Sequence, residues 1–205
     1  MSEILTKEKE KEQQILKAAR QIFARYGFSK TTMEDIADGV EMGKASLYYY
    51  FPTKESLFKA AMAEEKDEFV RQVEKILEKQ TSAVAKLHTY VEERLKFFQE
   101  LVNLGTLSVH SFLEKKSIFR NLFDEFGDQE LRIIKTIINE GKSSGEFKRD
   151  LGEYVPEILI HVLHGLRLRL IRSIAGATTM DNKTYRELLN EMLLTIDIFI
   201  TGIKP

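Results

Sequence analysis

The stretch from Thr31 to Lys54 most constrains the fold, because it reads as two short helices joined by a tight turn. Thr32 is a preferred N-cap residue and Asp35 follows three positions later, so the two predict a capping box at the start of the first helix. Apolar side chains recur there at helical spacing, at Ile36, Ala37 and Val40. The turn comprises Glu41, Met42 and Gly43. The second helix is expected over Lys44–Tyr50, and Pro52 ends it because proline lacks an N–H donor.

The second helix has one face for a core and another for a partner. At about 100° per residue, Leu47 and Phe51 share a face and should pack inward. Ala45 and Tyr49 point to the opposite side. Polar side chains flank them: Lys44, Ser46, Tyr48 and Tyr50. The major groove of B-DNA admits one α-helix, and small or hydroxylated side chains suit base edges and phosphates, so we expect a DNA-reading helix. The alternative is a helical hairpin whose tyrosines pack against another domain.

Lys54 stands in the first turn of the next helix, where Thr53 is the expected N-cap. A lysine at this end of a helix opposes the helix dipole, which makes sense beside a phosphate. The alternative is a solvated surface lysine, and position alone favours neither.

Three segments of the chain together resemble the TetR family of transcriptional regulators. Their patterns are Phe-x-x-x-Gly-Phe at Phe23–Phe28, Thr-Thr-x-x-x-Ile-Ala at Thr31–Ala37, and Leu-Tyr-x-Tyr-Phe-x-x-Lys-Glu-x-Leu at Leu47–Leu57. The resemblance covers about the first sixty residues, and the remainder is similar only in length and helical pattern.

The resemblance implies a set of DNA contacts. Thr32 would touch a phosphate. The residues that would face bases are Lys44, Ala45, Ser46 and Tyr49, and those that would hold the backbone are Tyr48, Tyr50 and Lys54. Leu47 and Phe51 would be core, in agreement with the periodicity. The family usually has glycine in the turn where this chain has Glu41, and glutamate adopts a left-handed backbone less readily, so the geometry of the turn is left open.

Composition limits the class of protein. The chain has 205 residues, with 31 Lys and Arg against 32 Asp and Glu and a formal net charge of -1. Proteins that coat nucleic acid are strongly basic, so we expect modest sequence-independent affinity and a specific site read by a dimer. The absence of cysteine excludes disulfides and thiolate catalysis. No signal peptide or membrane-spanning run is recognisable, so we expect a soluble cytoplasmic protein with no membrane partner.

The apolar pattern is helical throughout, which predicts an all-α fold with two domains. Residues 1–53 would form a three-helix, helix-turn-helix head that includes a helix over Glu8–Tyr26. Residues 54–205 would form a helical-bundle regulatory and dimerisation domain. Its expected helices are Lys54–Gln80, Ser82–Leu101, Leu104–Leu113, Ile118–Gly141, Glu153–Ala175 and Lys183–Ile203. The first of these would act as a lever between the body and the recognition helix.

The last two helices are candidates for a dimer interface. Tyr154–Ile174 is apolar on nearly every face, and Lys183–Ile203 carries a long apolar stripe. Two such helices from each subunit would form a four-helix interface across a two-fold axis, as in the TetR-like family. The alternative is that they complete the core of the monomer.

Aromatic and polar residues of the body suggest an effector pocket, since helix-bundle interiors are common ligand sites. The candidates are Phe97, Phe98, His110, Phe123, His161 and Arg167. Each has the alternative of an ordinary core or interface role. His161 and His164 are three residues apart but lack the further ligands of a metal site, so neither a metal nor a cofactor is expected. No catalytic constellation is found, and we expect no enzymatic activity.

Together these observations predict a homodimeric regulator that binds a palindromic operator in double-stranded DNA. We expect a repressor that a small apolar or amphipathic effector of unknown identity releases. One alternative is a DNA-binding regulator controlled by a protein partner without a small-molecule effector. Another is a helical small-molecule carrier or enzyme with a vestigial DNA head.

Overall fold

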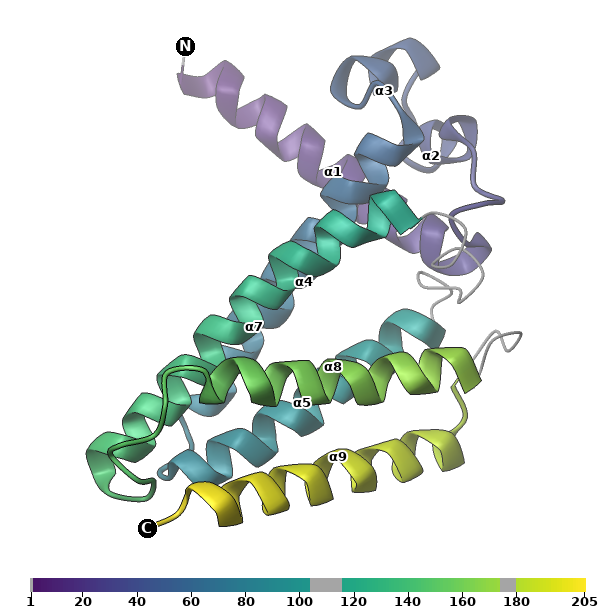
Figure 1. Ribbon diagram of the computed structural model, residues 1–205. Helices are drawn as coiled ribbons and strands as arrows, with labels where there is room; N and C mark the ends of the chain where they lie inside the picture. The colour runs from purple at the N-terminus through teal and green to yellow at the C-terminus, as the bar shows by residue number, and fades with distance from the viewer. Residues whose placement is uncertain (1, 104–115, 174–179) are drawn as a thin grey trace.

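The chain is helical throughout the part that the structure, a computed structural model, describes. That part comprises the backbone of residues 2–103, 116–173 and 180–205, and the side chains of residues 6–100, 126–167 and 180–205. The helices are α1 (Ser2–Tyr26), α2 (Met33–Gly39), α3 (Lys44–Tyr50), α4 (Lys54–Leu77), α5 (Ala83–Asn103), α7 (Lys116–Ser144), α8 (Val155–Ser173) and α9 (Asn182–Ile203) (Figure 1). No residue in these ranges lies in a strand, so the predicted all-α class is confirmed. None of these helices is long and apolar enough to cross a membrane.

α1, α2 and α3 form a three-helix head whose core is completed by the start of α4. The ring of Phe58 in α4 lies 5.1 Å from that of Phe23 and 4.8 Å from that of Phe28, centroid to centroid. Gly27 takes the left-handed conformation, with φ 77°, and its N–H donates to the Phe23 carbonyl at 2.8 Å. This αL cap ends α1 and folds Phe28 back onto the core. The head is therefore fastened to α4 through one aromatic cluster.

α4 continues from the head into the body. Its buried residues are Leu57, Phe58 and Ala61 near the head, and Phe69, Val73 and Leu77 further along. Arg20 of α1 also pairs with Glu64 and Glu65 of α4, at 3.7 and 3.5 Å. Because one helix packs with both parts, the division at residues 53 and 54 remains a prediction.

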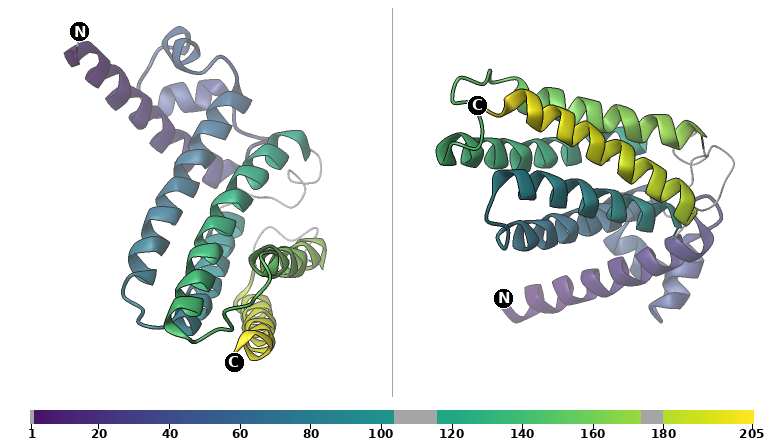
Figure 2. Two further views of the ribbon diagram at one scale, coloured as in Figure 1. Left: turned by 60° about the vertical axis from the view of Figure 1, so that its left-hand side comes forward. Right: turned by 90° about the horizontal axis from the view of Figure 1, so that it is seen from below.

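The body is a bundle in which α4, α5 and α7 pack on one another. α8 packs on α7, and α9 packs on both α5 and α8. α8 and α9 lie side by side on the flank far from the head (Figures 1 and 2). The helix predicted over Leu104–Leu113 lies outside the described residues.

The predicted end of α7 at Gly141 is wrong. The helix continues to Ser144 and ends at Gly145, whose φ is 81°. Gly141 is needed inside the helix because Phe147 folds back over it: a Cβ there would lie 2.1 Å from Phe147 Cδ2 and 2.9 Å from Ala83 Cβ. A glycine that the sequence presents as a helix break is therefore a packing site.

The predicted capping box starts α2. Thr32 Oγ1 accepts from the Asp35 N–H at 3.1 Å, and Asp35 Oδ2 accepts from the Thr32 N–H at 2.8 Å and from its hydroxyl at 2.7 Å. These hydrogen bonds, first the one from the Thr32 side chain, lower the pKa of Asp35. The start of the helix pair is thus fixed by the two residues that the sequence indicates.

The turn after α2 is a Schellman motif with glutamate in the left-handed position. Glu41 has φ 52° and its N–H donates to the Asp38 carbonyl at 3.1 Å. The Met42 N–H donates to the Ala37 carbonyl at 2.9 Å. Gly43, with φ -63°, is the N-cap of α3. The turn therefore has the geometry for which glycine is preferred, but Glu41 has to adopt it.

Replacing Glu41 by glycine should stabilise the protein. Glycine takes positive φ without a Cβ clash, so we expect a gain of about 0.5–1 kcal/mol in the free energy of unfolding, measured by urea denaturation. Glu41→Ala is the control: it removes the same charge but keeps a Cβ, and should give no gain. An equal gain in both variants would attribute the effect to charge rather than to backbone strain.

Gly141→Ala should destabilise the protein by about 1–3 kcal/mol, because the new methyl group would overlap the ring of Phe147. The measurement is the midpoint of urea denaturation followed by circular dichroism. Gly202→Ala, in α9, is the matched control, since a Cβ there meets nothing within 4 Å. If both variants unfolded at the wild-type midpoint, the packing at Gly141 would be looser than described.

Candidate nucleic-acid interface

α3 is anchored by two side chains and presents the rest to solvent. Leu47 is fully buried and Phe51 is 6% exposed, so the predicted inward face is confirmed. Tyr49 is 75% exposed and Tyr48 39% exposed. The other exposed side chains are Lys44, Ala45 and Ser46, while Tyr50 is half-buried and meets Tyr49 edge to face at 5.4 Å. The outward face is therefore open in the chain, and its contact with DNA stays a prediction.

Thr32 lies at the surface beside α3, but its hydroxyl hydrogen is engaged. The hydroxyl donates to Asp35, within the capping box. A phosphate at this point would compete with that carboxylate for the hydroxyl proton. The predicted phosphate contact of Thr32 therefore involves an exchange of hydrogen-bond partners.

Lys44 forms an ion pair with Glu34 that the sequence analysis missed. The Lys44 ammonium donates to Glu34 Oε1, which joins the start of α3 to the first turn of α2. This hydrogen bond lowers the pKa of Glu34 and raises that of Lys44. Both side chains are more than half exposed, so the pair is weak and open to exchange. Glu34 therefore offsets part of the positive charge at the proposed DNA face.

The ammonium group of Lys54 is held by backbone carbonyls of the head. Its Nζ donates to the carbonyls of Phe28 and Thr31, at 2.9 and 2.8 Å, and lies 4.6 Å from the centroid of the Phe28 ring. The solvated alternative is wrong, because these carbonyls take the place of water. Lys54 ties the first turn of α4 to the connection between α1 and α2, and its predicted phosphate contact remains untested.

The structure places four of the six predicted effector residues, and they differ in burial. Phe97, Phe98 and Arg167 are buried in the body. His161 is exposed on α8, so the expectation that it turns inward is wrong for the single chain. His110 and the side chain of Phe123 lie outside the described residues. The histidine that points to the interior is instead His164, nearly a full helical turn further on.

His164 belongs to a buried group of polar side chains, which we call the Glu130 cluster: Tyr90, Arg94, Glu130, His164 and Arg167. Glu130 Oε1 accepts from the Tyr90 hydroxyl at 2.7 Å and from Arg94 Nε at 2.6 Å. His164 Nε2 lies 2.9 Å from Glu130 Oε2, and Arg167 Nη2 lies 3.4 Å from Oε1. The cluster joins α5, α7 and α8 through one carboxylate.

The charges of the Glu130 cluster act strongly on one another. Burial alone would raise the pKa of Glu130, but Arg167, Arg94 and the hydrogen bond with His164 hold it well below its usual range. Burial, and then repulsion from Arg167, lower the pKa of Arg94.

One feature of the sequence indicates this cluster. Glu130 interrupts the apolar stripe that includes Phe126, Ile134 and Ile137. A charged residue on a buried stripe needs a partner.

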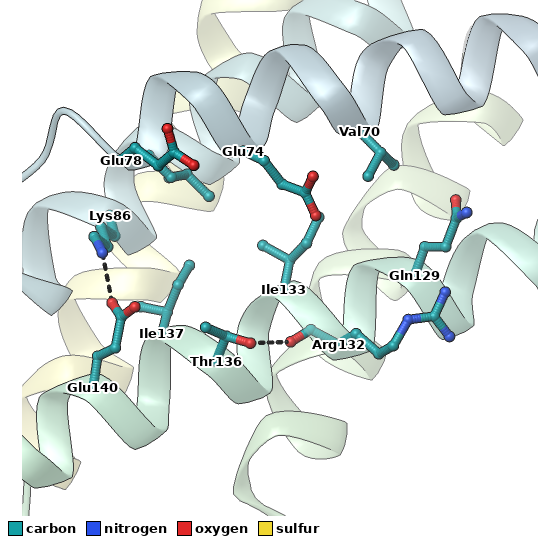
Figure 3. A pocket seen from close by; sticks show the side chains of 11 residues that line it. Val70, Glu74, Glu78, Lys86, Gln129, Arg132, Ile133, Thr136, Ile137 and Glu140 are labelled. Atoms are coloured by element: carbon teal, nitrogen blue, oxygen red, sulfur yellow. Dashed lines mark hydrogen bonds and ion pairs between the residues drawn. The ribbon is translucent and has the colours of Figure 1, made fainter.

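A groove of about 560 Å³ opens between α4 and α7, toward the end of α4 that is far from the head. Its acidic lining includes Glu74, Glu78 and Glu140, and Lys86 pairs with Glu140 at 2.6 Å (Figure 3). Of the predicted effector residues whose side chains are described, Phe97, Phe98, His161 and Arg167, none lines it. The groove is therefore distinct from the Glu130 cluster in both place and charge.

Comparisons with known proteins cover most of the chain. The family model described as bacterial regulatory proteins of the TetR family matches residues 15–61, and that of the C-terminal region of YsiA-like proteins matches residues 62–164. The chain is 28% identical over 151 residues to the uncharacterized HTH-type transcriptional regulator YfiR of Bacillus subtilis, covering 69% of this chain and 73% of that protein.

Solved structures agree in fold. A transcriptional regulator from Cytophaga hutchinsonii is 37% identical with a TM-score of 0.82, covering 93% of this chain and 97% of that one. The regulator FadR from Bacillus subtilis, solved in complex with stearoyl-CoA, is 21% identical with a TM-score of 0.66, covering 93% and 98%. With two family models over residues 15–164 and a relative above 30% identity over nearly its full length, the chain belongs to the TetR family of transcriptional regulators.

Proposed function

We propose that this regulator is a homodimer that binds a palindromic operator through α3 and releases it when a small molecule binds the body. One observation carries the DNA-reading part: Tyr49 is 75% exposed on a short helix whose opposite face is locked into the core. A large aromatic side chain that is mostly exposed on an otherwise fixed helix contributes little to the core of the head. It suits a partner that admits one helix and offers base edges and thymine methyl groups.

The residues around Tyr49 fall into two groups, those that face bases and those that contact the sugar–phosphate backbone. Ala45 and Ser46 are small and exposed, so they let α3 approach the base edges closely. Lys44 reaches bases once it leaves Glu34. The groups that hold the sugar–phosphate backbone are Thr32, Tyr48, Tyr50 and Lys54. Because few cations are free at this surface, binding depends on a matched site more than on bulk charge.

The dimer interface is supported by apolar side chains that α8 and α9 leave exposed. In α9, Leu194 and Ile198 are 60% and 66% exposed, on the side opposite to its buried residues. In α8, Ile158 and Val162 are also exposed opposite to the buried side. Large apolar side chains gathered on two adjacent helices are typical of a surface that a second subunit covers. A dimer would place two copies of α3 roughly 34–36 Å apart, one turn of DNA.

α4 supplies the path from the body to α3. Its first turn is tied to the head by Lys54 and Phe58, and Phe69 further along stacks on Phe97 of α5 at 4.4 Å. A change in the packing of α5 therefore moves α4, and the head moves with it. An effector that binds one arrangement several kcal/mol better than the other would switch operator binding.

A small apolar or amphipathic effector is supported by a structural neighbour that was solved with stearoyl-CoA. That ligand belongs to the neighbour, and the likeness between the two chains is one of fold. We propose repression as the sign of regulation, since release by an effector then induces the controlled genes.

Tyr49→Ala should weaken binding to the cognate operator roughly tenfold to a hundredfold, because a specific contact is worth about 1–3 kcal/mol. The operator would first be selected from random DNA with the wild-type protein, and binding then measured by fluorescence anisotropy. Affinity for a scrambled duplex should not change. Tyr49→Phe is the matched control and should lose less, since it keeps the ring. If Tyr49→Ala discriminated between the two duplexes as well as wild type, Tyr49 would not read the site.

Ile198→Asp should convert the dimer into a monomer, because an unpaired carboxylate in an apolar interface costs several kcal/mol. Analytical ultracentrifugation at a concentration where the wild type is dimeric would show the change. Tyr26→Asp is the control: it puts the same charge on an exposed aromatic residue of the head and should leave the dimer intact. A dimeric Ile198→Asp protein would place the interface elsewhere.

A further inference from the structure

The Glu130 cluster contains more buried positive charge than negative charge. Arg94, Glu130 and Arg167 have side chains that are only 5%, 2% and 7% exposed. Among the described residues, Glu130 is the one carboxylate within ion-pair distance of either guanidinium. One carboxylate balances one guanidinium, so a full positive charge remains among these three side chains. Buried charges are normally paired, so this excess calls for an anion.

The two guanidiniums also have unused hydrogen-bonding capacity. Arg94 Nη1 is buried and has no hydrogen-bond partner in the described part of the chain. Arg167 reaches Glu130 only through long contacts of 3.4 and 3.5 Å from Nη2. A buried donor without an acceptor costs about 1–3 kcal/mol, and more when it is charged. A second acceptor with a negative charge would remove both this deficit and the excess charge.

The surroundings of Arg94 are aromatic rather than polar. Its guanidinium carbon lies 4.1 Å from the centroid of the Phe126 ring and 5.8 Å from those of Phe69 and Phe97. The rings of Phe69 and Phe97 are stacked at 4.4 Å. Guanidinium groups and apolar walls therefore occur together, which is the lining expected for a molecule with an anionic head and an apolar body.

The cluster can be approached from solvent beside α8. The His164 side chain is 31% exposed although its Nε2 contacts the buried Glu130. Gly127 of α7 lies next to it, and a Cβ at Gly127 would approach His164 Cε1 to 3.8 Å. The solvent-facing side of the cluster therefore lies at this edge between α7 and α8, where His164 separates Glu130 from water.

We propose that Arg94 and Arg167 bind the anionic head of an amphipathic effector, a carboxylate or phosphate monoester that carries an apolar chain. This inference rests on the proposed function and specifies the chemistry of its effector. The anion takes hydrogen bonds from guanidinium groups that Glu130 now holds, so the ties between α5, α7 and α8 rearrange. Arg94 lies over the stack that includes Phe69, so the rearrangement reaches α4.

The first test is isothermal titration calorimetry of the full-length protein without DNA. The probes are decanoate, decyl phosphate and the neutral 1-decanol, each below its micelle concentration. We expect at least one anion to bind saturably and at least tenfold more tightly than 1-decanol, and the preferred head distinguishes carboxylate from phosphate. Equal binding of all three, or no binding of either anion, would overturn the proposal.

Two variants of the Glu130 cluster should change anion affinity in opposite directions. Arg94→Met should weaken binding of the preferred anion roughly tenfold to a hundredfold, as expected for lost charge-assisted hydrogen bonds. Glu130→Gln removes the competing carboxylate and should strengthen binding several-fold while lowering the melting temperature. Arg132→Met, an exposed arginine of α7 that lines the groove, is the matched control and should bind as wild type does.

Glu130→Gln keeps the test decisive even if Arg94→Met folds poorly. A cluster that serves only stability predicts that Glu130→Gln lowers the melting temperature and leaves anion binding unchanged or weaker, and that result would contradict the proposal. Operator binding is measured separately by fluorescence anisotropy with and without the anion. If the anion binds but the protein does not release DNA, the anion site stands and the proposed effector response is refuted. If the protein binds its operator normally but binds no anion, the anion site is refuted and the proposed DNA-binding function stands.

Discussion

The fastening of α4 to the head is the interaction on which the rest of the structure depends. Lys54 donates hydrogen bonds to two backbone carbonyls of the connection between α1 and α2. Phe58 packs in the core of the head beside Phe23 and Phe28. The hydrogen bonds of Lys54 and the packing of Phe58 restrict how far the start of α4 can move relative to the head. The head therefore cannot pivot independently of the first turns of α4. In the switch that we propose, a motion of α4 that originates in the body is delivered to α3 through these contacts.

The Glu130 cluster is the counterpart of that joint in the body. Its ion pairs are weak evidence for stability, because hydrophobic residues of similar volume often stabilise a core equally well. In our proposal the cluster provides alternatives: its guanidinium groups exchange one carboxylate for another anion, whereas a packed core has one arrangement. Phe69 then links this exchangeable site to α4 through its stack with Phe97. A rigid joint at one end and an exchangeable one at the other are what a lever requires.

Local signals predicted the head well, and long-range partners explain what the sequence left unseen. The Thr32 capping box and the inward pair of Leu47 and Phe51 depend on neighbours within four residues, so spacing alone identifies them. The partners of Glu130 lie 34 to 40 residues away along the chain, and only its place on an apolar stripe hints at them. His161 and His164 lie only about 60° apart around the helix, so periodicity alone could not decide which one faced inward, and the packing of α8 fixes it.

The two lysines of the proposed DNA face are held by other groups of the protein, and this determines how a movement of α4 can act on DNA binding. Glu34 pairs with Lys44, and two backbone carbonyls hold the charged Nζ of Lys54 in place, so neither ammonium is free to follow the phosphates of DNA of any sequence. In the proposed dimer, affinity then comes from two copies of α3 that enter successive turns of one groove together. Binding of this kind is sensitive to spacing, because the second contact is lost as soon as the two helices no longer match the repeat of the duplex. Under the proposed mechanism, a modest displacement of α4 in each subunit is therefore enough to release the operator, and no unfolding of the head is required.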